Sequence, residues 1–353
     1  MAEGPKSIAD MTCPTPLRAT DTILLGHGSG GKLSADLVRA LFLPAFWNPA
    51  LSRLDDQAVV NVNGLRIAIT TDSFVVKPLF FPGGDIGSLA VHGTVNDLAV
   101  GGAQPLFLSA AFIIEEGLSR DVLRRVVESL RKAADSAGVQ VVTGDTKVVE
   151  NGSGDGLFIT TTGIGLVPDG LEMSANRARP GDKVLLSGSI GDHGIAILAQ
   201  REGLEFESAI RSDSAALHTL VGEMLQVTRE IRCMRDPTRG GLSSALNEIA
   251  AQSRVTIELI ERAIPIREEV KGACELLGLD PLYVANEGKL IAIVAASAAE
   301  NLVATMRRHR LGNQAAIIGT VTDTNPGLVV MRTPLGTTRI VDMLAGDQLP
   351  RIC

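Results

Sequence analysis

The chain has 353 residues, of which 45% are hydrophobic and 21% are charged. This composition is typical of a folded globular protein and excludes extensive disorder. The net charge of −7 disfavours nucleic-acid binding, because proteins that hold phosphate backbones usually carry a basic face. The length predicts about two domains.

Four cysteines are widely spaced and form no CxxC pair: Cys13, Cys233, Cys274 and Cys353. This spacing argues against a zinc site and against a disulfide scaffold, and it fits a reducing cytoplasm. Residues 1–16 lack the apolar core of a secretory signal, and the apolar stretch 98–114 is interrupted by Gly and Pro. We therefore expect a soluble cytoplasmic protein without a membrane segment.

The first half of the chain begins with residues 1–22, which are rich in Pro and Thr and are expected to form a mobile leader. The clearest helix is predicted at 119–138, where apolar residues recur on one face, Ser119 can cap the start and Gly138 can end the helix. The other expected elements are a helix at 33–43 and strands at 65–71 (ending at Asp72), 139–143 and 157–167.

A loop rich in Pro, Gly and Asp at 168–182 marks the expected boundary between a first domain, 23–168, and a second domain, 169–341. Ser297 with Glu300 predicts a capping box at the start of a helix. Residues 342–353 are expected to form a flexible tail. The other elements expected in the second domain are strands at 183–187, 290–295 and within 315–341, and helices after 192 and at 240–252 and 266–278.

A glycine-rich loop at 26–32, GHGSGGK, nearly matches the P-loop pattern. The pattern then requires Ser or Thr to bind Mg²⁺, and here the residue is Leu33. The loop's backbone N–H groups can still hold phosphates, because glycine permits close approach. On the sequence alone, a flexible turn before a helix is an equally good interpretation.

Acidic residues stand where strands or apolar runs are expected to end. Singly, each is more typical of a helix cap or a turn. If they converge, they form an oxygen-rich site suited to Mg²⁺ with nucleotide phosphates, which replaces the missing P-loop hydroxyl. These residues are Asp56, Asp72, Asp97 and Asp145, with Asp236 as a fifth.

Two further charged residues have both a structural and a functional interpretation. Lys147 is typical of a solvated charge, but near phosphates it acts as a point charge. Glu287 is typical of a surface turn, but it can act as a general base if burial raises its pKa. His27, His92 and His193 lie in Gly-rich turns, where structural roles are favoured over catalytic ones.

Ten motifs occur in the order seen in the HypE family, the carbamoyl dehydratases of [NiFe]-hydrogenase maturation, and the resemblance covers residues 24–353. The terminal PRIC is the most specific motif, because the wider superfamily of aminoimidazole ribonucleotide synthetase, selenophosphate synthetase and thiamine-phosphate kinase lacks it. The motifs are GHGSGGK, LDDQA, TTDSFVV, GTVNDLAVGGA, FIIEEG, VTGDTKVV, SGSIGDHG, RDPTRGG, ANEGK and PRIC.

The resemblance implies a two-domain α+β fold that dimerises through its first domain, with ATP near the interface. It also implies a reaction on the chain itself. The carbamoyltransferase HypF places a carbamoyl group on Cys353, ATP phosphorylates the carbamoyl oxygen, and loss of phosphate leaves a thiocyanate. The cyanide then passes to iron on the HypC–HypD complex.

The resemblance also assigns roles to individual residues. Lys147 and Glu287 match positions proposed to remove the N–H protons. The matches for Mg²⁺–ATP are Asp56, Asp72, Asp97 and Asp145, with Asp236 as a further metal ligand and Asn96 in support. The loop residues that would close over the phosphates are Gly28, Gly30, Gly31 and Lys32.

Two other functions remain compatible with the sequence. One is an ATP-dependent ligase or kinase of the same superfamily that acts on a small molecule, which would retain turnover without Cys353. The other is a non-catalytic adaptor that carries a thiol-bound group between partners. Such an adaptor would tolerate replacement of Asp72 or Lys147.

Overall fold

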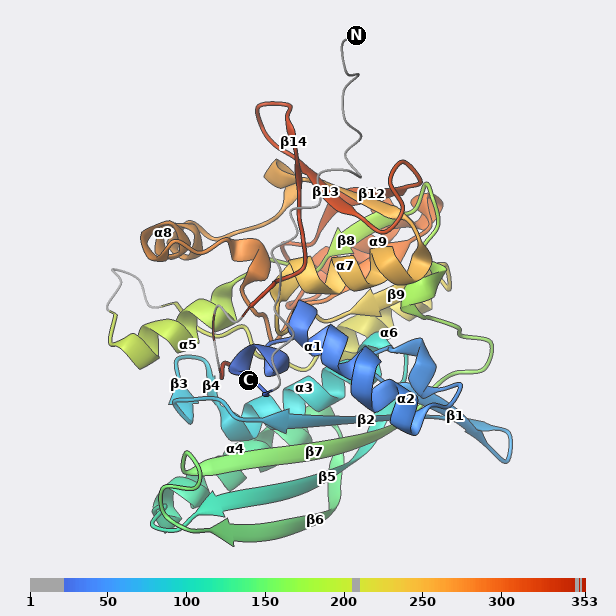
Figure 1. Cartoon of the computed structure of the whole chain (residues 1–353). Coiled ribbons are helices and arrows are strands. Elements are labelled where there is room, and N and C mark those ends of the chain that lie inside the picture. Colours follow the sequence, from blue (N-terminus) through green and yellow to red (C-terminus); the bar gives the residue numbers. More distant parts are fainter. Residues whose placement is uncertain (1–21, 205–209, 347–348, 350) are drawn as a thin grey trace.

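The computed structural model describes residues 22–204, 210–346, 349 and 351–353. Most of the predicted leader, including Cys13, therefore lies outside the described residues. The described chain forms an α+β fold with two large sheets, one in the lower and one in the upper half of Figure 1. The predicted fold class is therefore confirmed.

The first sheet has five strands in the order β1-β2-β7-β5-β6. Helices α3 and α4 cover one of its faces (Figure 1), and α4 connects the parallel strands β5 and β6. The bounds are β1 Ala58–Val62, β2 Leu65–Phe74, α3 Ile86–Val100, β5 Gln104–Glu115, α4 Arg120–Ala137, β6 Gln140–Val149 and β7 Leu157–Leu166.

The second sheet has seven strands in the order β14-β13-β10-β12-β8-β11-β9. Alternate residues of β8 enter two different cores, Leu185 one and Leu186 the other. Both faces of this sheet are therefore buried, which explains the continuous apolar run of β8. The strands are β8 Lys183–Leu186, β9 Ile231–Arg235, β10 Thr256–Ile260, β11 Ile291–Val294, β12 Ala316–Thr322, β13 Val329–Arg332 and β14 Thr338–Ile340.

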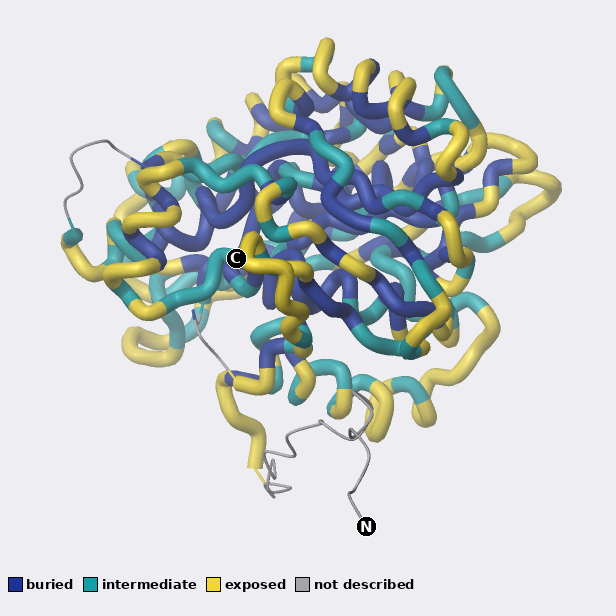
Figure 2. Tube along the Cα trace, turned by 90° about the horizontal axis from the view of Figure 1, so that it is seen from above, coloured by how far each residue is buried: buried dark blue, intermediate teal, exposed yellow. Residues whose placement is uncertain are grey.

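The remaining elements surround these sheets, and Figure 2 shows buried chain through the middle of the molecule with exposed chain at its periphery. None of the helices in the described parts of the chain is both long and apolar enough to cross a lipid bilayer. The remaining bounds are α1 Lys32–Leu37, a π-helical turn Val38–Phe42, α2 Leu43–Phe46, β3 Phe80–Phe81, β4 Gly84–Asp85, α5 Asp192–Glu202, α6 His218–Val227, α7 Gly241–Ser253, α8 Glu268–Leu277 and α9 Ala296–Arg308.

Helix α4 follows its prediction closely. Ser119 is the N-cap and accepts a hydrogen bond from the Asp121 backbone N–H, and Gly138 ends the helix at φ +67°. Val126 and Leu130 are buried on the predicted face, whereas Val127 is exposed. The cap, the left-handed glycine and the apolar stripe therefore agree on one helix.

Other predicted boundaries were wrong. The strand expected at 139–143 continues through Asp145 and Lys147, and the strand expected to stop at Asp72 continues to Phe74. Asp97 ends no strand, because it lies within α3. The polar residues did not end these elements, since Asp145 and Lys147 lie on the edge strand β6, while Asp72 and Asp97 border a polar pocket.

The capping box predicted at Ser297 was also wrong. The N-cap of α9 is Ala295, which has no side-chain cap. The Ser297 hydroxyl donates instead to Glu230 Oε2 at 3.0 Å on the surface. Ser297 is therefore the second residue of α9 and does not cap the helix.

This difference predicts unequal effects for two serine substitutions. Ser119→Ala should destabilise the protein by about 1 kcal/mol, because α4 loses its N-cap. Ser297→Ala should change stability by less than about 0.5 kcal/mol, because it removes only an exposed hydrogen bond. Urea unfolding of both variants measures the difference, and equal effects would contradict the assignment of the caps.

Candidate active site

A polar pocket between the two halves of the molecule collects acidic side chains from five separate segments. Its lining includes Thr71, Ser73, Gly93, Thr238 and Arg239. Its ionisable groups include four of the five predicted aspartates, the predicted glutamate and the predicted terminal thiol, namely Asp56, Asp72, Asp97, Asp236, Glu287 and Cys353.

Each aspartate reaches the pocket from a different element. Asp72 lies on β2 and Asp97 on α3, while Asp236 directly follows β9. Gly93 of α3 keeps the helix close to β2, because a Cβ there would lie 2.9 Å from the Phe74 ring and 3.5 Å from Asp72 Oδ2. The absence of a side chain at this position therefore keeps the space beside Asp72 open.

Two polar residues hold Asp56 and Asp97 in place. The Thr70 hydroxyl lies 2.7 Å from Asp97 Oδ2 and 2.9 Å from the Asp56 carbonyl oxygen. Arg235 pairs with the Asp56 carboxylate and donates to the Leu54 carbonyl at 2.6 Å. Asp56 is therefore paired with an arginine, whereas Asp97 forms no ion pair with any of the described residues.

The pocket disfavours accumulated negative charge. Burial raises the pKa of Asp97 and of Asp236 well above the ordinary value, and repulsion from neighbouring aspartates adds to the rise in both. Burial also raises the pKa of Asp72, and it raises that of Asp56 to about 6 although Arg235 opposes the rise. A bound cation would relieve this repulsion.

The residues therefore fit a magnesium–phosphate group, although they do not supply a complete set of metal ligands. In the part of the chain that the structure describes, no group of three or more His, Cys, Asp or Glu side chains could hold a metal ion. Mg²⁺ keeps several water or phosphate ligands and needs only one or two carboxylates. Part of its coordination would thus come from the nucleotide.

The raised pKa of Asp97 predicts that Asp97→Asn stabilises the protein at pH 7, by on the order of 1 kcal/mol. A raised native pKa makes the native state bind more protons than the unfolded chain, so wild-type stability falls as pH rises above the ordinary Asp value. The neutral amide avoids that loss. Thermal unfolding should show that Asp97→Asn is more stable than wild type at pH 7 and that this difference is smaller at pH 4. A less stable variant at pH 7 would contradict the raised pKa of Asp97.

Glu287 is held through its backbone, while one oxygen of its carboxylate finds no partner among the described residues. Its N–H donates to Asp213 Oδ1 at 3.1 Å, and its carbonyl accepts from Asn96 Nδ2 at 3.2 Å. The residue is 2% exposed, and Glu287 Oε1 has no hydrogen-bond partner in the part of the chain that the structure describes. Burial, followed by repulsion from nearby aspartates, raises its pKa well above the ordinary value.

Asn96 therefore supports the site indirectly. Its side chain donates to the carbonyls of Ala215 and Glu287 and accepts from the Leu217 N–H at 2.8 Å. All three amide contacts go to backbone groups, so Asn96 fixes the loop that carries Glu287. The sequence prediction grouped it with the nucleotide ligands, and in this structure its polar atoms are already occupied.

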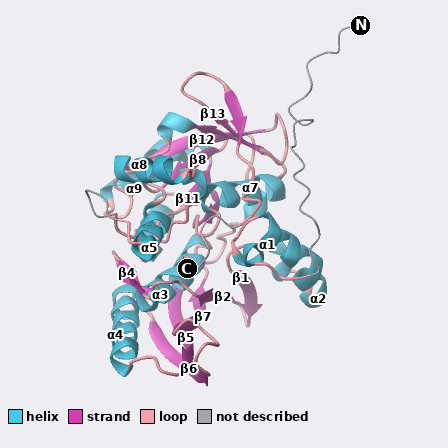
Figure 3. Ribbon diagram, turned by 60° about the vertical axis from the view of Figure 1, so that its left-hand side comes forward, coloured by secondary structure: helices cyan, strands magenta, loops and turns pink. Residues whose placement is uncertain are grey.

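The described tail residues are docked in the site, as Figures 1 and 3 show for the C-terminal end. The Val75 N–H donates to a main-chain carboxylate oxygen of Cys353 at 2.9 Å, and the Lys77 N–H donates to the Arg351 carbonyl oxygen at 3.2 Å. Arg351 also pairs with Asp155. Burial raises the pKa of the Cys353 thiol to about 12, and Arg239 partly opposes the rise.

The predicted glycine loop packs against the tail and against Arg239. The Lys32 N–H donates to the Leu344 carbonyl at 2.8 Å, and Arg239 donates to the Gly28 carbonyl at 3.0 Å. Gly30 has φ +74°, and a Cβ there would lie 2.6 Å from the Arg239 Cβ. Gly28 lines a second pocket that also contains Cys353, whereas Lys32 is exposed and lines neither pocket.

Arg239 is a site residue that the sequence reasoning missed. It lines both pockets that contain Cys353, and the proximity of Cys353 and of the pocket's carboxylates raises its pKa. It therefore carries a positive charge beside the sulfur. The RDPTRGG motif contained the signal, but only its aspartate was singled out.

Asp145 and Lys147 do not join the other predicted site residues within one chain. Strand pairing places them beside Ala111 and Ile113, on the face of the first sheet opposite Asp72. Two strands, β7 and β5, separate β2 from β6, a distance of about 14 Å at ordinary strand spacing. The Lys147 ammonium lies 2.7 Å from Asp145 Oδ2, and this hydrogen bond lowers the Asp145 pKa.

Both halves of the chain match known family models. Residues 54–167 match the family model described as "AIR synthase related protein, N-terminal domain", and residues 179–331 match "AIR synthase related protein, C-terminal domain". The two matched regions correspond to the strands of the five-stranded and seven-stranded sheets, apart from β14.

Individual relatives cover nearly the full chain. The carbamoyl dehydratase HypE of Azotobacter vinelandii is 61% identical over 93% of this chain and 96% of its own length. The same-named protein of Escherichia coli K12 is 45% identical over 94% and 100%.

Among solved structures, HypE in complex with ATP is 52% identical, with a TM-score of 0.79 over 94% of this chain and all of that chain. The HypE–HypF complex matches with 49% identity and a TM-score of 0.83, over 87% and 99%. With sequence and fold in agreement over nearly the whole length, this chain belongs to the HypE family of carbamoyl dehydratases.

Proposed function

We propose that the protein dehydrates the S-carbamoylated side chain of its own Cys353 to a thiocyanate, with ATP as the phosphoryl donor. The observation that carries this proposal is the docked tail, whose Cys353 lines the same pocket as Glu287 and four aspartates. The thiocyanate supplies the cyanide ligands of the [NiFe]-hydrogenase iron.

The proposed chemistry accounts for the acidic pocket. The carbamoyl oxygen attacks the γ-phosphorus of ATP, ADP leaves, and the oxygen becomes part of a phosphate leaving group. Removal of the nitrogen-bound protons then forms the C≡N bond as phosphate departs, which gives thiocyanate, ADP and phosphate. Glu287 takes a proton in this scheme, because a carboxylate with a raised pKa is a stronger base near neutral pH.

The other pocket residues would bind the nucleotide. One or two carboxylates among Asp72, Asp97 and Asp236 are proposed to hold Mg²⁺, whose other ligands would be nucleotide phosphates and water, while Asp56 stays paired with Arg235. Mg²⁺, when bound, neutralises phosphate charge as it develops. The backbone of Gly28, Gly30 and Gly31 would lie along the phosphates, and Arg239 would balance charge near the sulfur.

We also propose a homodimer formed by the open face of the first sheet. That face carries exposed apolar side chains, and Thr71 and Ser73 on the same face line the pocket. The homodimer gives Asp145 and Lys147 a route to the site, because a partner packed on this face would carry its own copies of them past Thr71 and Ser73. The apolar residues that strand pairing places on this face are Ile69, Phe107, Ile113 and Ile164.

The tail must also leave the pocket, because its sulfur exchanges groups with other proteins. We propose the carbamoyltransferase HypF as the carbamoyl donor, supported by the likeness to a solved HypE–HypF complex. The HypC–HypD complex is the proposed cyanide acceptor. We place these exchanges in the cytoplasm, without nucleic acid or membrane.

Intact and peptide-level mass spectrometry tests the proposal. The chain is incubated with HypF, carbamoyl phosphate and ATP, and the C-terminal peptide should gain a carbamoyl group that then loses the mass of one water. Cys353→Ser should show no thiocyanate. A wild-type peptide that never shows either adduct would contradict the function, and full ATP turnover by Cys353→Ser with a small molecule would favour a small-molecule kinase.

A further inference from the structure

A buried histidine outside the proposed chemistry contacts the docked tail through the tail's backbone. His193 Nε2 lies 2.6 Å from the Ile352 carbonyl oxygen, directly before the carrier cysteine, and His193 Nδ1 lies 2.8 Å from Ser212 Oγ. Its exposed fraction is 0%, and the Phe81 ring meets it edge to face at 5.6 Å. His193 is therefore fixed between the tail and one internal segment.

Hydrogen-bond chemistry fixes the proton arrangement of this contact. A carbonyl oxygen only accepts, so His193 Nε2 carries the proton that binds Ile352. Burial lowers the His193 pKa, and in the neutral ring Nδ1 then accepts from the Ser212 hydroxyl. Ser212 Oγ in turn accepts the Ser214 N–H at 3.1 Å. The hydrogen bonds that link Ile352, His193, Ser212 and Ser214 thus have one consistent assignment of donors and acceptors.

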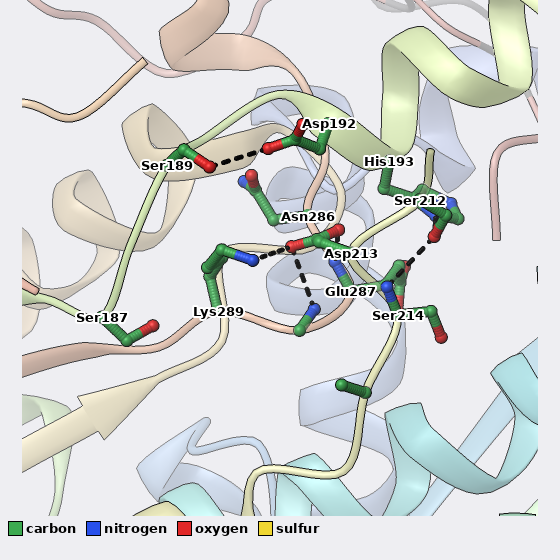
Figure 4. A network of polar contacts seen from close by, with 12 residues as sticks. Ser187, Ser189, Asp192, His193, Ser212, Asp213, Ser214, Asn286, Glu287 and Lys289 are labelled. Carbon is green, nitrogen blue, oxygen red and sulfur yellow. Dashed lines mark hydrogen bonds and ion pairs between the residues drawn. The ribbon is translucent and has the colours of Figure 1, made fainter. Parts of the chain in front are cut away.

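The segment that contains Ser212 also holds Glu287. Asp213 accepts from the Glu287 N–H at 3.1 Å and the Gly288 N–H at 3.2 Å, and it pairs with Lys289 at 2.9 Å. Figure 4 shows Asp213 between Lys289 on one side and the Ser212–His193 pair on the other. The same short segment is therefore connected to the base and, through His193, to the tail.

We propose that His193 is the positioning residue for the carrier tail: it binds the Ile352 carbonyl and holds the Cys353 sulfur in register with Glu287. The contact is made to backbone, so it is independent of the group that the sulfur carries. A free tail and a carbamoylated tail can therefore dock in the same way. This inference extends the proposed function, since it names what positions the substrate for the base.

The test measures how accessible the Cys353 thiol is, without carbamoyl donor or ATP. The full-length protein is treated with iodoacetamide, and alkylation of the C-terminal peptide is followed by mass spectrometry. In His193→Asn the amide reaches only the position of Nδ1, so the bond to Ile352 is lost. In His193→Gln the amide reaches the position of Nε2, so that bond can be kept.

Alkylation of Cys353 should accelerate about 5- to 30-fold in His193→Asn, the range expected for loss of one buried hydrogen bond. It should return to within a few-fold of wild type in His193→Gln. His92→Asn is the matched control, because His92 lies on α3, contacts Ser214 Oγ at 2.9 Å and forms no hydrogen bond with the described tail residues. Equal rates in His193→Asn and wild type would overturn the proposal, as would equal acceleration in His92→Asn.

A second readout separates tail placement from a general loss of structure. Dehydration of the carbamoylated tail should slow in His193→Asn, while carbamoyl transfer from HypF, which uses the undocked tail, should be unchanged or faster. If His193→Asn does not fold, Ser212→Ala replaces it and should accelerate alkylation about 5-fold, since His193 loses the partner that fixes its proton. An unchanged rate there would overturn the proposal.

The two proposals can fail separately. A C-terminal peptide that is never carbamoylated would refute the proposed function, while the alkylation experiment would still report on His193. Conversely, normal thiocyanate formation with unchanged alkylation in His193→Asn would remove the positioning role and leave the function intact.

Discussion

Glu287→Gln is expected to lower the rate of dehydration of the carbamoylated tail by about 10²- to 10⁴-fold, the range typical for loss of a general base. The amide has the same shape but cannot accept the nitrogen-bound proton. Single-turnover mass spectrometry of the pre-carbamoylated protein with ATP measures this step. ATP binding should remain, because the proposed phosphate ligands are other residues.

The pH dependence gives a second check on the same residue. The base must be deprotonated, so the wild-type rate should rise with pH through the raised pKa of Glu287, well above the ordinary Glu value. Glu287→Gln should lose this rise. Glu230→Gln is a matched control at an exposed carboxylate. A Glu287→Gln rate close to wild type would assign proton removal to another group.

Arg235→Met is expected to destabilise the protein by about 3–5 kcal/mol at pH 7, because it leaves the Asp56 carboxylate without its arginine. The side chain of Arg235 is 9% exposed and that of Asp56 16%, so water cannot replace the lost partner fully. Arg124→Met is the control. It breaks an exposed pair with Asp121 on α4 and should cost less than about 1 kcal/mol.

The pH dependence of the destabilisation by Arg235→Met shows whether it arises from the unpaired Asp56 carboxylate. Arg235 lowers the Asp56 pKa, which burial otherwise raises, so removing Arg235 lifts that pKa further above about 6. The cost of Arg235→Met is then greatest above that pH and shrinks as Asp56 is protonated on acidification. Urea unfolding at pH 7.5 and pH 5 should show this decline. A second change, Asp56→Asn, should recover much of the loss, and no recovery would contradict the pairing.

Local sequence signals predicted the elements whose causes are local. Helix α4 was predicted with both ends, because its cap, glycine and apolar face lie within one stretch of chain. The strand at 157–167 was predicted almost to the residue. Helix α3 was missed, since it is buried on nearly every side and its apolar residues therefore show no stripe.

The site depended on contacts that the sequence does not display. The sequence pattern places the five aspartates at the ends of strands or apolar runs. Three of them lie inside elements instead, yet Asp72 and Asp97 meet because Gly93 lets α3 approach β2. Asp145 has the same local pattern as Asp72, and only strand order and side-chain alternation place it on the other face. The tail docks through backbone groups of Val75 and Lys77, which no side-chain motif reveals.

The docked tail also has a consequence for oxidative damage. Peroxides attack the thiolate form of cysteine and convert it first to a sulfenic acid and then, irreversibly, to higher acids. Burial raises the pKa of the docked Cys353 thiol to about 12, so almost none of it is ionised at neutral pH. The docked pocket therefore protects Cys353 from oxidants, and in the proposed cycle the sulfur is vulnerable only while the tail is outside.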